Sequence, residues 1–319
     1  NICNIIEYHK PKYVILENVR NLATHDKGNT WKIIREKINE LGYNTYAKPI
    51  ILNSLYFGIP QSRERVVILC KRKDLGELED FPKIPTIKKI TKLSSIIENN
   101  VNAKYNLSPK LKQTETVWNN FIQLLYDNKI AIPKFPIWTD WWDSDGNNTT
   151  VTKKDSNISD DDNKKNIIKK QKDFYKKYTN WIDKNRNFYK KHNNILNLWL
   201  TQSRTNFPLW KGAVRKLEWQ AGEKLLDMNE VLWSPRGSGV RIKKLNYSPT
   251  LVAMASMIPI YGPQSRQLTP RECARLQSFP DNFVVDADDK EAYKQFGNAV
   301  NVKMIEKCVG FLIYNIPLF

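Results

Sequence analysis

Residues 10–22 of the 319-residue chain read KPKYVILENVRNL, and an apolar run at residues 13–16 ends directly in Glu17 and Asn18. A short run that is apolar at every position is typical of a strand in a parallel sheet covered by helices on both faces. Ligands of open α/β sheets bind beyond the carboxyl ends of such strands. Glu17 is therefore a candidate catalytic carboxylate, and the alternative is a strand end that meets water.

The sequence on either side of this stretch favours an α/β fold for residues 1–80. Apolar residues share one face of a helix predicted at residues 1–9. A second helix is predicted from residue 29 or 30 to residue 41, because apolar residues recur at helical spacing and Gly42 follows. The remaining predicted strands are residues 48–52 and 66–70.

The sequence IPQSRERVVIL, residues 59–69, leads into the second of these strands. Gln61, Arg63 and Arg65 occupy alternate positions, which project to one side of an extended backbone. Guanidinium groups bind phosphates, carboxylates and carbonyl oxygens in planar geometry. This side is therefore a candidate polar binding face, and the alternative is a solvated strand entry that carries surface charge.

Two motifs stand near the end of the chain. In RQLTPRECARLQSFPDNF, residues 266–283, Thr269 and Pro270 predict the start of a helix. In QFGNAV, residues 295–300, Gly297 permits a close approach of the backbone, and Asn298 offers a donor and an acceptor together. A contact with a cofactor is one interpretation of QFGNAV, and the first turn of a helix is the other. The final helix is predicted at residues 302–313.

Positive charge is concentrated in the middle of the chain. The net charge is +18, and residues 81–265 carry 31 Lys and Arg against 16 Asp and Glu, whereas the rest carries 20 against 17. A basic region on a nearly neutral scaffold indicates a polyanionic partner, most directly nucleic acid. The alternative is a lysine-rich composition bias. Within this region residues 143–165 read as a mobile insertion, and a long helix with an apolar stripe is predicted at about residues 167–200.

Composition excludes several other classes of protein. No apolar run reaches the roughly 18 residues that a membrane span needs, and no secretory signal is visible, so we expect an intracellular protein that is not secreted. The four cysteines have neither metal-ligand nor disulfide spacing. The three histidines are scattered, so we expect no metal site and no histidine-based triad.

The order of these motifs resembles the later half of the DNA (cytosine-5)-methyltransferases. The matching parts are residues 10–72 and 235–305, with a long variable basic region between them. The resemblance implies an α/β fold, with part of a Rossmann-like, S-adenosylmethionine-dependent methyltransferase sheet and a mixed target-recognition domain. The implied domains are residues 1–80 (catalytic), 81–265 (recognition of double-stranded DNA) and 266–319 (helices that return to the catalytic domain).

The resemblance also implies roles for individual residues. Glu17 matches the glutamate that engages N3 of a flipped-out cytosine, and Arg65 matches the arginine that holds its O2. Arg63 matches a neighbouring residue that supports the catalytic loop. Supporting positions are Asn18 and Gln61, and the positions that close over S-adenosylmethionine are Asn298, Ala299 and Val300.

Two motifs of the family are missing from this sequence. There is no Phe-x-Gly-x-Gly loop for the cofactor, and none of the four cysteines lies in a Pro-Cys-Gln nucleophile motif. We therefore expect that most of the S-adenosylmethionine site and the nucleophile lie outside this chain, so that the chain alone is incomplete and inactive. It would be a fragment, or one subunit of a split restriction-modification-type methyltransferase whose partner polypeptide carries both motifs. The alternative is a non-catalytic remnant that binds duplex DNA.

Overall fold

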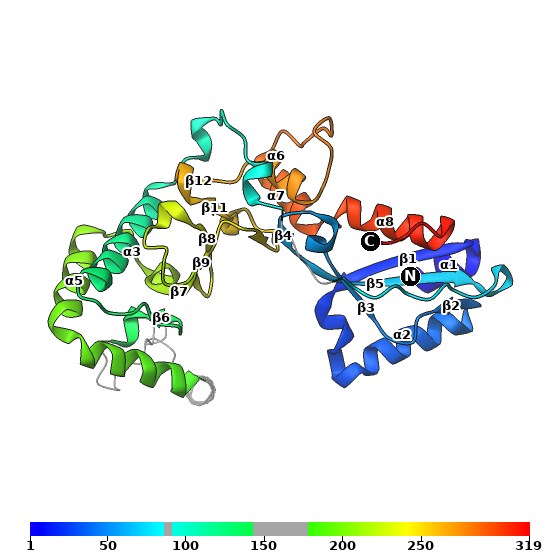
Figure 1. The fold of residues 1–319 in the computed structure, drawn as a ribbon, viewed down its shortest axis with the longest axis horizontal. Helices are drawn as coiled ribbons and strands as arrows, with labels where there is room; N and C mark the ends of the chain where they lie inside the picture. Colours follow the sequence, from blue (N-terminus) through cyan, green and yellow to red (C-terminus); the bar gives the residue numbers. More distant parts are fainter. Residues whose placement is uncertain (86–90, 143–177) are drawn as a thin grey trace, which may run out of the picture. The chain divides into compact units, whose positions relative to one another are not determined.

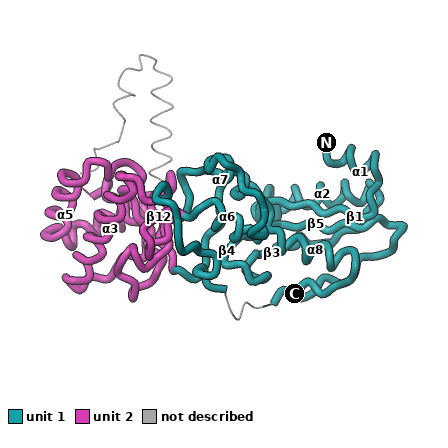
Figure 2. The backbone as a smooth tube through the Cα atoms, turned by 90° about the horizontal axis from the view of Figure 1, so that it is seen from above, with its two compact units in different colours: residues 1–105, 245–259, 268–319 teal, residues 106–244, 260–267 magenta. Residues whose placement is uncertain are grey.

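The computed structural model describes residues 1–85, 91–142 and 178–319, which form two compact units (Figure 1, Figure 2). Unit 1 comprises residues 1–105, 245–259 and 268–319, and unit 2 comprises residues 106–244 and 260–267. The division falls after residue 105. The insertion predicted near residues 143–165 lies outside the described residues. The assignment of a catalytic and a recognition domain stays a prediction.

The sheet of unit 1 is built around one central strand, β5. Each of the other three strands pairs with β5 in antiparallel orientation, so the prediction of a parallel sheet is wrong for these strands. Only ten residues separate the end of β3 from the start of β5, and a short connection of this kind suits antiparallel neighbours, because parallel ones need a crossover. The strands are β1 (Tyr13–Val19), β2 (Tyr43–Thr45), β3 (Ile50–Asn53) and β5 (Glu64–Arg72).

The two faces of β5 bury different sets of residues. Val67 and Leu69 pack in one apolar cluster with helix α8 (Val302–Tyr314). Val66 and Ile68 pack in another cluster with α1 (Ile2–His9) and α2 (Asn29–Glu40). Because side chains alternate along a strand, the continuous apolar run of β5 is buried on both sides. The α/β fold class is therefore confirmed, with helices on both faces of the sheet (Figure 1).

The helices of unit 1 follow the predictions closely. α1, α2 and α8 lie where they were expected, although α2 is preceded by Gly28 and has no side-chain cap. At the start of α6 (Pro270–Leu276), Thr269 Oγ1 accepts a hydrogen bond from the Glu272 amide at 3.1 Å, and the Glu272 carboxylate accepts one from the Thr269 amide at 2.8 Å. This reciprocal capping confirms the predicted helix start.

One local prediction in unit 1 is wrong. Gly297 and Asn298 are the last residues of α7 (Asp289–Asn298), so they do not form the first turn of the final helix. Ala299 caps α7, and Asn301 begins α8 by accepting a hydrogen bond from the Met304 amide. The QFGNAV sequence thus ends one helix and leads into the next. Two short parallel strands complete the unit: β4 (Gln61–Ser62) and β10 (Ser248–Pro249).

Unit 2 contains a six-stranded sheet in the order β12-β11-β8-β9-β7-β6. Its only parallel pair among the described residues is β7 with β9. The strands are β6 (Ile137–Trp138), β7 (Lys216–Gln220), β8 (Leu232–Arg236), β9 (Gly239–Lys243), β11 (Ile260–Tyr261) and β12 (Arg266–Gln267).

The helices of unit 2 enclose an aromatic core. They are α3 (Pro109–Asp127), residues 178–191 and α5 (Asn193–Asn206). The prediction of a single helix to residue 200 is wrong, because the helix breaks at His192 and the next one, α5, continues to Asn206. The first part of the predicted helix lies outside the described residues. Trp118 and Trp210 are fully buried and both donate their indole N–H to the Val214 carbonyl. Of the predicted apolar stripe, Ile182 and Leu196 are buried in the core, whereas Trp181 is 39% exposed.

Candidate active-site surface of unit 1

Glu17 and Arg65 form an ion pair on the central sheet. Glu17 lies opposite Val67 in the β1–β5 register, so Arg65 is its diagonal neighbour on the same face. Arg65 Nε donates to Glu17 Oε1 at 2.7 Å, and the two side chains are only 12% and 23% exposed. Glu17 therefore lies inside β1 rather than beyond its end, which corrects the sequence interpretation. The structure places a carboxylate and a guanidinium side by side in a partly buried position.

Arg63 has a different environment from Arg65. Its side chain is 1% exposed, and it donates to three backbone carbonyls: Leu251 at 3.1 Å, Gly297 at 3.1 Å and Ala299 at 2.7 Å. Burial, together with the smaller effect of the positive charge of Arg65, lowers the pKa of Arg63 to about 10, although Glu17 offsets part of the shift. Arg63 is still protonated at neutral pH. Its guanidinium ties together backbone segments that are almost 190 and 240 residues away in the sequence.

Gly297 allows this arrangement to form. A Cβ atom at Gly297 would lie 2.4 Å from the Ala253 nitrogen and 2.5 Å from the Val252 carbonyl carbon. No real side chain fits at such distances, so the end of α7 packs directly on the backbone of residues 252 and 253. The close approach predicted for Gly297 exists, and its partner is this backbone.

A buried amide that the sequence analysis missed fixes the loop that carries Arg63. Asn53, at the end of β3, accepts hydrogen bonds through Oδ1 from the Leu55 amide at 3.1 Å and the Arg63 amide at 3.2 Å. Its Nδ2 donates to Ser62 Oγ at 3.3 Å. An Asn that ends a strand and caps the following 3₁₀ turn is the signal that would have identified it.

The other predicted site residues are not gathered around the ion pair. Gln61 is fully buried, and its side-chain amide has no hydrogen-bond partner among the described residues. Asn18 is exposed and accepts from the amide of Val19 at 2.8 Å. Asn298 is exposed, whereas Ala299 and Val300 are half-buried.

The described residues offer one side of a possible cofactor site. Val300 lines an open recess of about 420 Å³ together with residues of α8: Val302, Ile305, Glu306 and Val309. This recess is almost entirely apolar, so it suits a ring or hydrocarbon surface and supplies few polar partners. With so few polar groups, this recess does not by itself fit the polar parts of S-adenosylmethionine.

Three of the four cysteines are poor nucleophiles. Burial raises the pKa of Cys70 and of Cys308 to about 12, and full burial raises the pKa of Cys273 as well. Their thiols are therefore protonated at neutral pH, and a protonated thiol does not attack. Cys3 lies on α1 and is partly exposed. No group of side chains in the described ranges could hold a metal ion, and none of the helices described there is long and apolar enough to cross a membrane.

Comparison with known proteins identifies the class to which this fold and site belong. The family model described as C-5 cytosine-specific DNA methylase matches residues 1–313. The chain therefore belongs to the C-5 cytosine-specific DNA methylase family, as the order of its motifs predicted.

Individual relatives are type II methyltransferases. M.BanI of Aneurinibacillus aneurinilyticus is 29% identical over 98% of this chain and 73% of its own length. M1.ScrFI of Lactococcus lactis subsp. cremoris is 27% identical over 95% of this chain and 52% of its own length. M.HhaI of Haemophilus parahaemolyticus is 26% identical over 99% and 66%. The chain thus spans between about half and three quarters of the length of these relatives.

Proposed function

We propose that this chain supplies the base-activating part of a DNA cytosine-5 methyltransferase of the restriction-modification type. The observation that carries this proposal is the ion pair of Glu17 with Arg65, 2.7 Å apart and partly shielded from water. N3 and O2 are neighbouring atoms on one edge of cytosine. A carboxyl group and a guanidinium group held side by side are complementary to that edge.

The chemistry follows from this complementarity. For this step the Glu17 carboxyl group takes up a proton from water, and a hydrogen bond or proton passed from it to N3 withdraws electron density from the ring and makes C6 electrophilic. Arg65 stabilises the negative charge that accumulates on O2 when a thiolate adds to C6. A ring atom inside a duplex is inaccessible, so the cytosine must leave the stack at a cost of about a few kcal/mol. Partial burial strengthens both contacts, because water screens them less.

Arg63 acts as a positioning residue in this proposal. Within the described residues, the hydrogen bonds of its side chain all go to backbone carbonyls, so it holds the loop of Arg65 against residues 251 and 297–299. Asn53 secures the same loop from the other end. A site held by buried hydrogen bonds of this kind keeps its geometry when the substrate binds.

The nucleophile and most of the cofactor site come from outside the described residues in this proposal. S-adenosylmethionine would supply the methyl group, with Asn298, Ala299 and Val300 along one of its edges. A polypeptide with Phe-x-Gly-x-Gly and Pro-Cys-Gln, either separate or continuous with this chain, would supply the loop and the thiolate. M.BanI and M1.ScrFI both contain further sequence besides the part that matches this chain. This supports the need for additional sequence to supply the loop and the thiolate.

The test combines this chain with such a polypeptide and measures transfer of labelled methyl groups to cytosine-containing duplexes. Glu17→Gln should reduce the rate of transfer by about 100-fold or more, the range expected for loss of a general acid. Binding of the same duplex should stay nearly unchanged. An unchanged rate would remove Glu17 from the mechanism, and no transfer to any duplex by the unaltered mixture would contradict the split-enzyme form.

A second candidate function rests on the basic residues 81–265. With 31 Lys and Arg against 16 acidic residues, this region alone supports a non-catalytic protein that binds duplex DNA. Its affinity should fall steeply with salt, because neutralised phosphates release counterions. Salt-dependent binding without any restorable methyl transfer would favour this candidate over the enzyme.

A further inference from the structure

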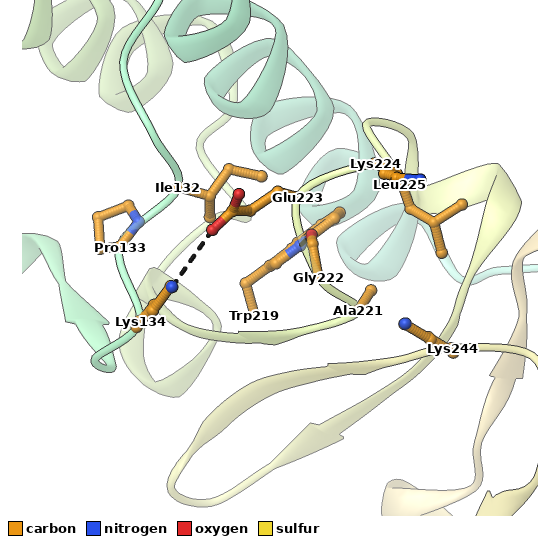
Figure 3. A pocket seen from close by; sticks show the side chains of 10 residues that line it. All are labelled: Ile132, Pro133, Lys134, Trp219, Ala221, Gly222, Glu223, Lys224, Leu225 and Lys244. Carbon is orange, nitrogen blue, oxygen red and sulfur yellow. Dashed lines mark hydrogen bonds and ion pairs between the residues drawn. The ribbon is translucent and has the colours of Figure 1, made fainter.

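A cavity of about 650 Å³ opens in unit 2 beyond the parallel pair of strands (Figure 3). Trp219 of β7 and residues 221–225, which follow this strand, line the cavity, and so does Lys244, directly after the end of β9. Cavities of this size that are largely apolar, with a few fixed polar groups, are typical of small-ligand sites. The apolar lining includes Trp219, Ile132 and Leu225.

Trp219 is held in a single orientation at this cavity. Its indole Nε1 donates to the Gly222 carbonyl at 2.7 Å, and Gly222 has a φ of +87°, a turn conformation that favours glycine. The residue is 9% exposed, so most of it is anchored in the core while a small part lines the cavity. A rigid aromatic surface of this kind stacks on a planar ring with little loss of conformational entropy.

The charged residues around the cavity favour an anion. Lys134, Lys224 and Lys244 contribute three positive charges, and Glu223 is the one acidic lining residue. Glu223 is already paired with Lys134, 3.3 Å away (Figure 3). The stem of Lys244 lies over Gly222, where its Cε would be 3.5 Å from an added Cβ. The two lysines without an acidic partner among the described residues are therefore Lys224 and Lys244.

We propose that this cavity binds one unpaired nucleotide of a nucleic-acid strand, with the base against Trp219 and the adjoining phosphate at Lys224 and Lys244. The combination of an aromatic surface with nearby cations is how proteins hold single strands, because every base has a π face and every nucleotide a phosphate. A paired base inside a duplex hides its faces, so the site selects a looped-out or single-stranded nucleotide. It does not involve Glu17 or Arg65.

The test measures the equilibrium binding of fluorescein-labelled single-stranded oligodeoxynucleotides to the full chain by anisotropy. One probe is a short strand that contains all its bases. The second has the same length and charge but lacks the base at its central position. Stacking predicts about tenfold weaker binding of the abasic probe. Lys224→Ala with Lys244→Ala should weaken binding of the intact probe about tenfold and flatten the salt dependence by about one to two units of log–log slope.

The matched control removes two exposed lysines of unit 2 that lie away from the cavity, Lys110→Ala with Lys191→Ala. This control should leave the affinity for the intact probe nearly unchanged, whereas the cavity variant should lower it. Equal losses in both variants, no difference between the probes, or equally strong competition by polyglutamate of the same charge would each overturn the proposal. The measurement needs no cofactor, thiol or duplex, so it is independent of the methyltransferase test.

Discussion

Charged residues are used in opposite ways in the two units. In unit 1 the guanidinium of Arg63 is buried and tied to three carbonyls, and Arg65 is tied to Glu17. In unit 2, Lys224 and Lys244 line an open cavity and have no acidic partner among the described residues. The first arrangement fixes a geometry, and the second leaves charge available for a partner.

This difference separates two kinds of function. A group that activates a ring must be held within a fraction of an ångström of its place, which requires internal partners. Groups that neutralise phosphates gain more from staying solvated and adaptable until the polyanion arrives. Substitutions in unit 1 should therefore change stability together with activity, whereas substitutions of the unit 2 lysines should change affinity alone.

The largest effect is expected from glycines in the two units. Gly297→Ala places a Cβ 2.4 Å from the Ala253 nitrogen and should lower the free energy of unfolding by about 3 kcal/mol. Gly222→Ala in unit 2 meets only the flexible stem of Lys244, so its positive φ alone should cost about 1 kcal/mol. Urea denaturation measures both. Gly310→Ala in α8 is the control, since its Cβ makes only ordinary contacts with the side chain of Ile316; losses of equal size at Gly297 and Gly222 would contradict the comparison.

The next effect distinguishes the two arginines of unit 1. Arg63→Met leaves three buried carbonyls without donors and should cost about 2 kcal/mol of stability. Arg65→Met should cost about 1 kcal/mol or less, because its ion pair is partly solvated, yet in the completed enzyme it should reduce methyl transfer more than its stability loss explains. Thermal melting and the transfer rate are the two measurements. If Arg65→Met were both less active and less stable than Arg63→Met, the assignment of Arg63 as the positioning residue would fail.

The last expected effect, the smallest for any single group, is a response to alkaline pH of opposite sign in the two units. All four cysteines belong to unit 1, and burial raises the pKa of Cys70 and Cys308 from 9 to about 12. Above pH 9 the unfolded thiols release protons that the folded ones keep, so unit 1 loses stability as the pH rises, by about 1 kcal/mol per thiol at pH 10. Arg63 has the opposite effect, but only above about pH 10. There the folded state releases the proton of Arg63 while the unfolded state keeps it, so this residue contributes stability as the pH rises.

Unit 2 should respond in the other direction. Burial lowers the pKa of Lys216 and of Lys243, so between the lowered values and the ordinary value of 10.5 the unfolded chain binds more protons. Stability of unit 2 therefore rises with pH in that window. Hydrogen exchange followed by mass spectrometry at pH 8 and pH 10 would report each unit separately. Parallel changes in the two units would show that these buried groups do not govern the response.

The sequence predicted the individual elements of unit 1 better than their arrangement. The helices at α1, α6 and α8 were predictable because local signals, such as Thr269 and Pro270, act on the next few residues. The direction of the strands was not, because an apolar run such as residues 66–70 is buried on both faces in either kind of sheet. Strand pairing is decided by connections elsewhere in the chain.

The candidate site was predictable only in part for a similar reason. The motif order placed Glu17 and Arg65 in one site, and the β1–β5 register brings them together. The contrast between Arg63 and Arg65 was not visible, since the two occupy equivalent positions in QSRER. What separates them is contact with residues 251, 297 and 299. Asn53 was missed because its one local signal, an Asn that caps the turn after a strand, does not show that its side chain also reaches the Arg63 amide.

The three bonds of Arg63 also set an order of assembly. Its partners lie beyond the first segment of unit 2 in the sequence, at residues 251, 297 and 299. During synthesis, β1 and β5 are available to pair once residue 72 has emerged, whereas Arg63 must wait until residue 299 has emerged. Long loops close slowly, because their entropy is lost before the contact is gained. The ion pair of Glu17 and Arg65 can thus form on the ribosome before the three hydrogen bonds of Arg63 do. A chain stopped within unit 2 would carry Glu17 and Arg65 without the contacts that fix their geometry.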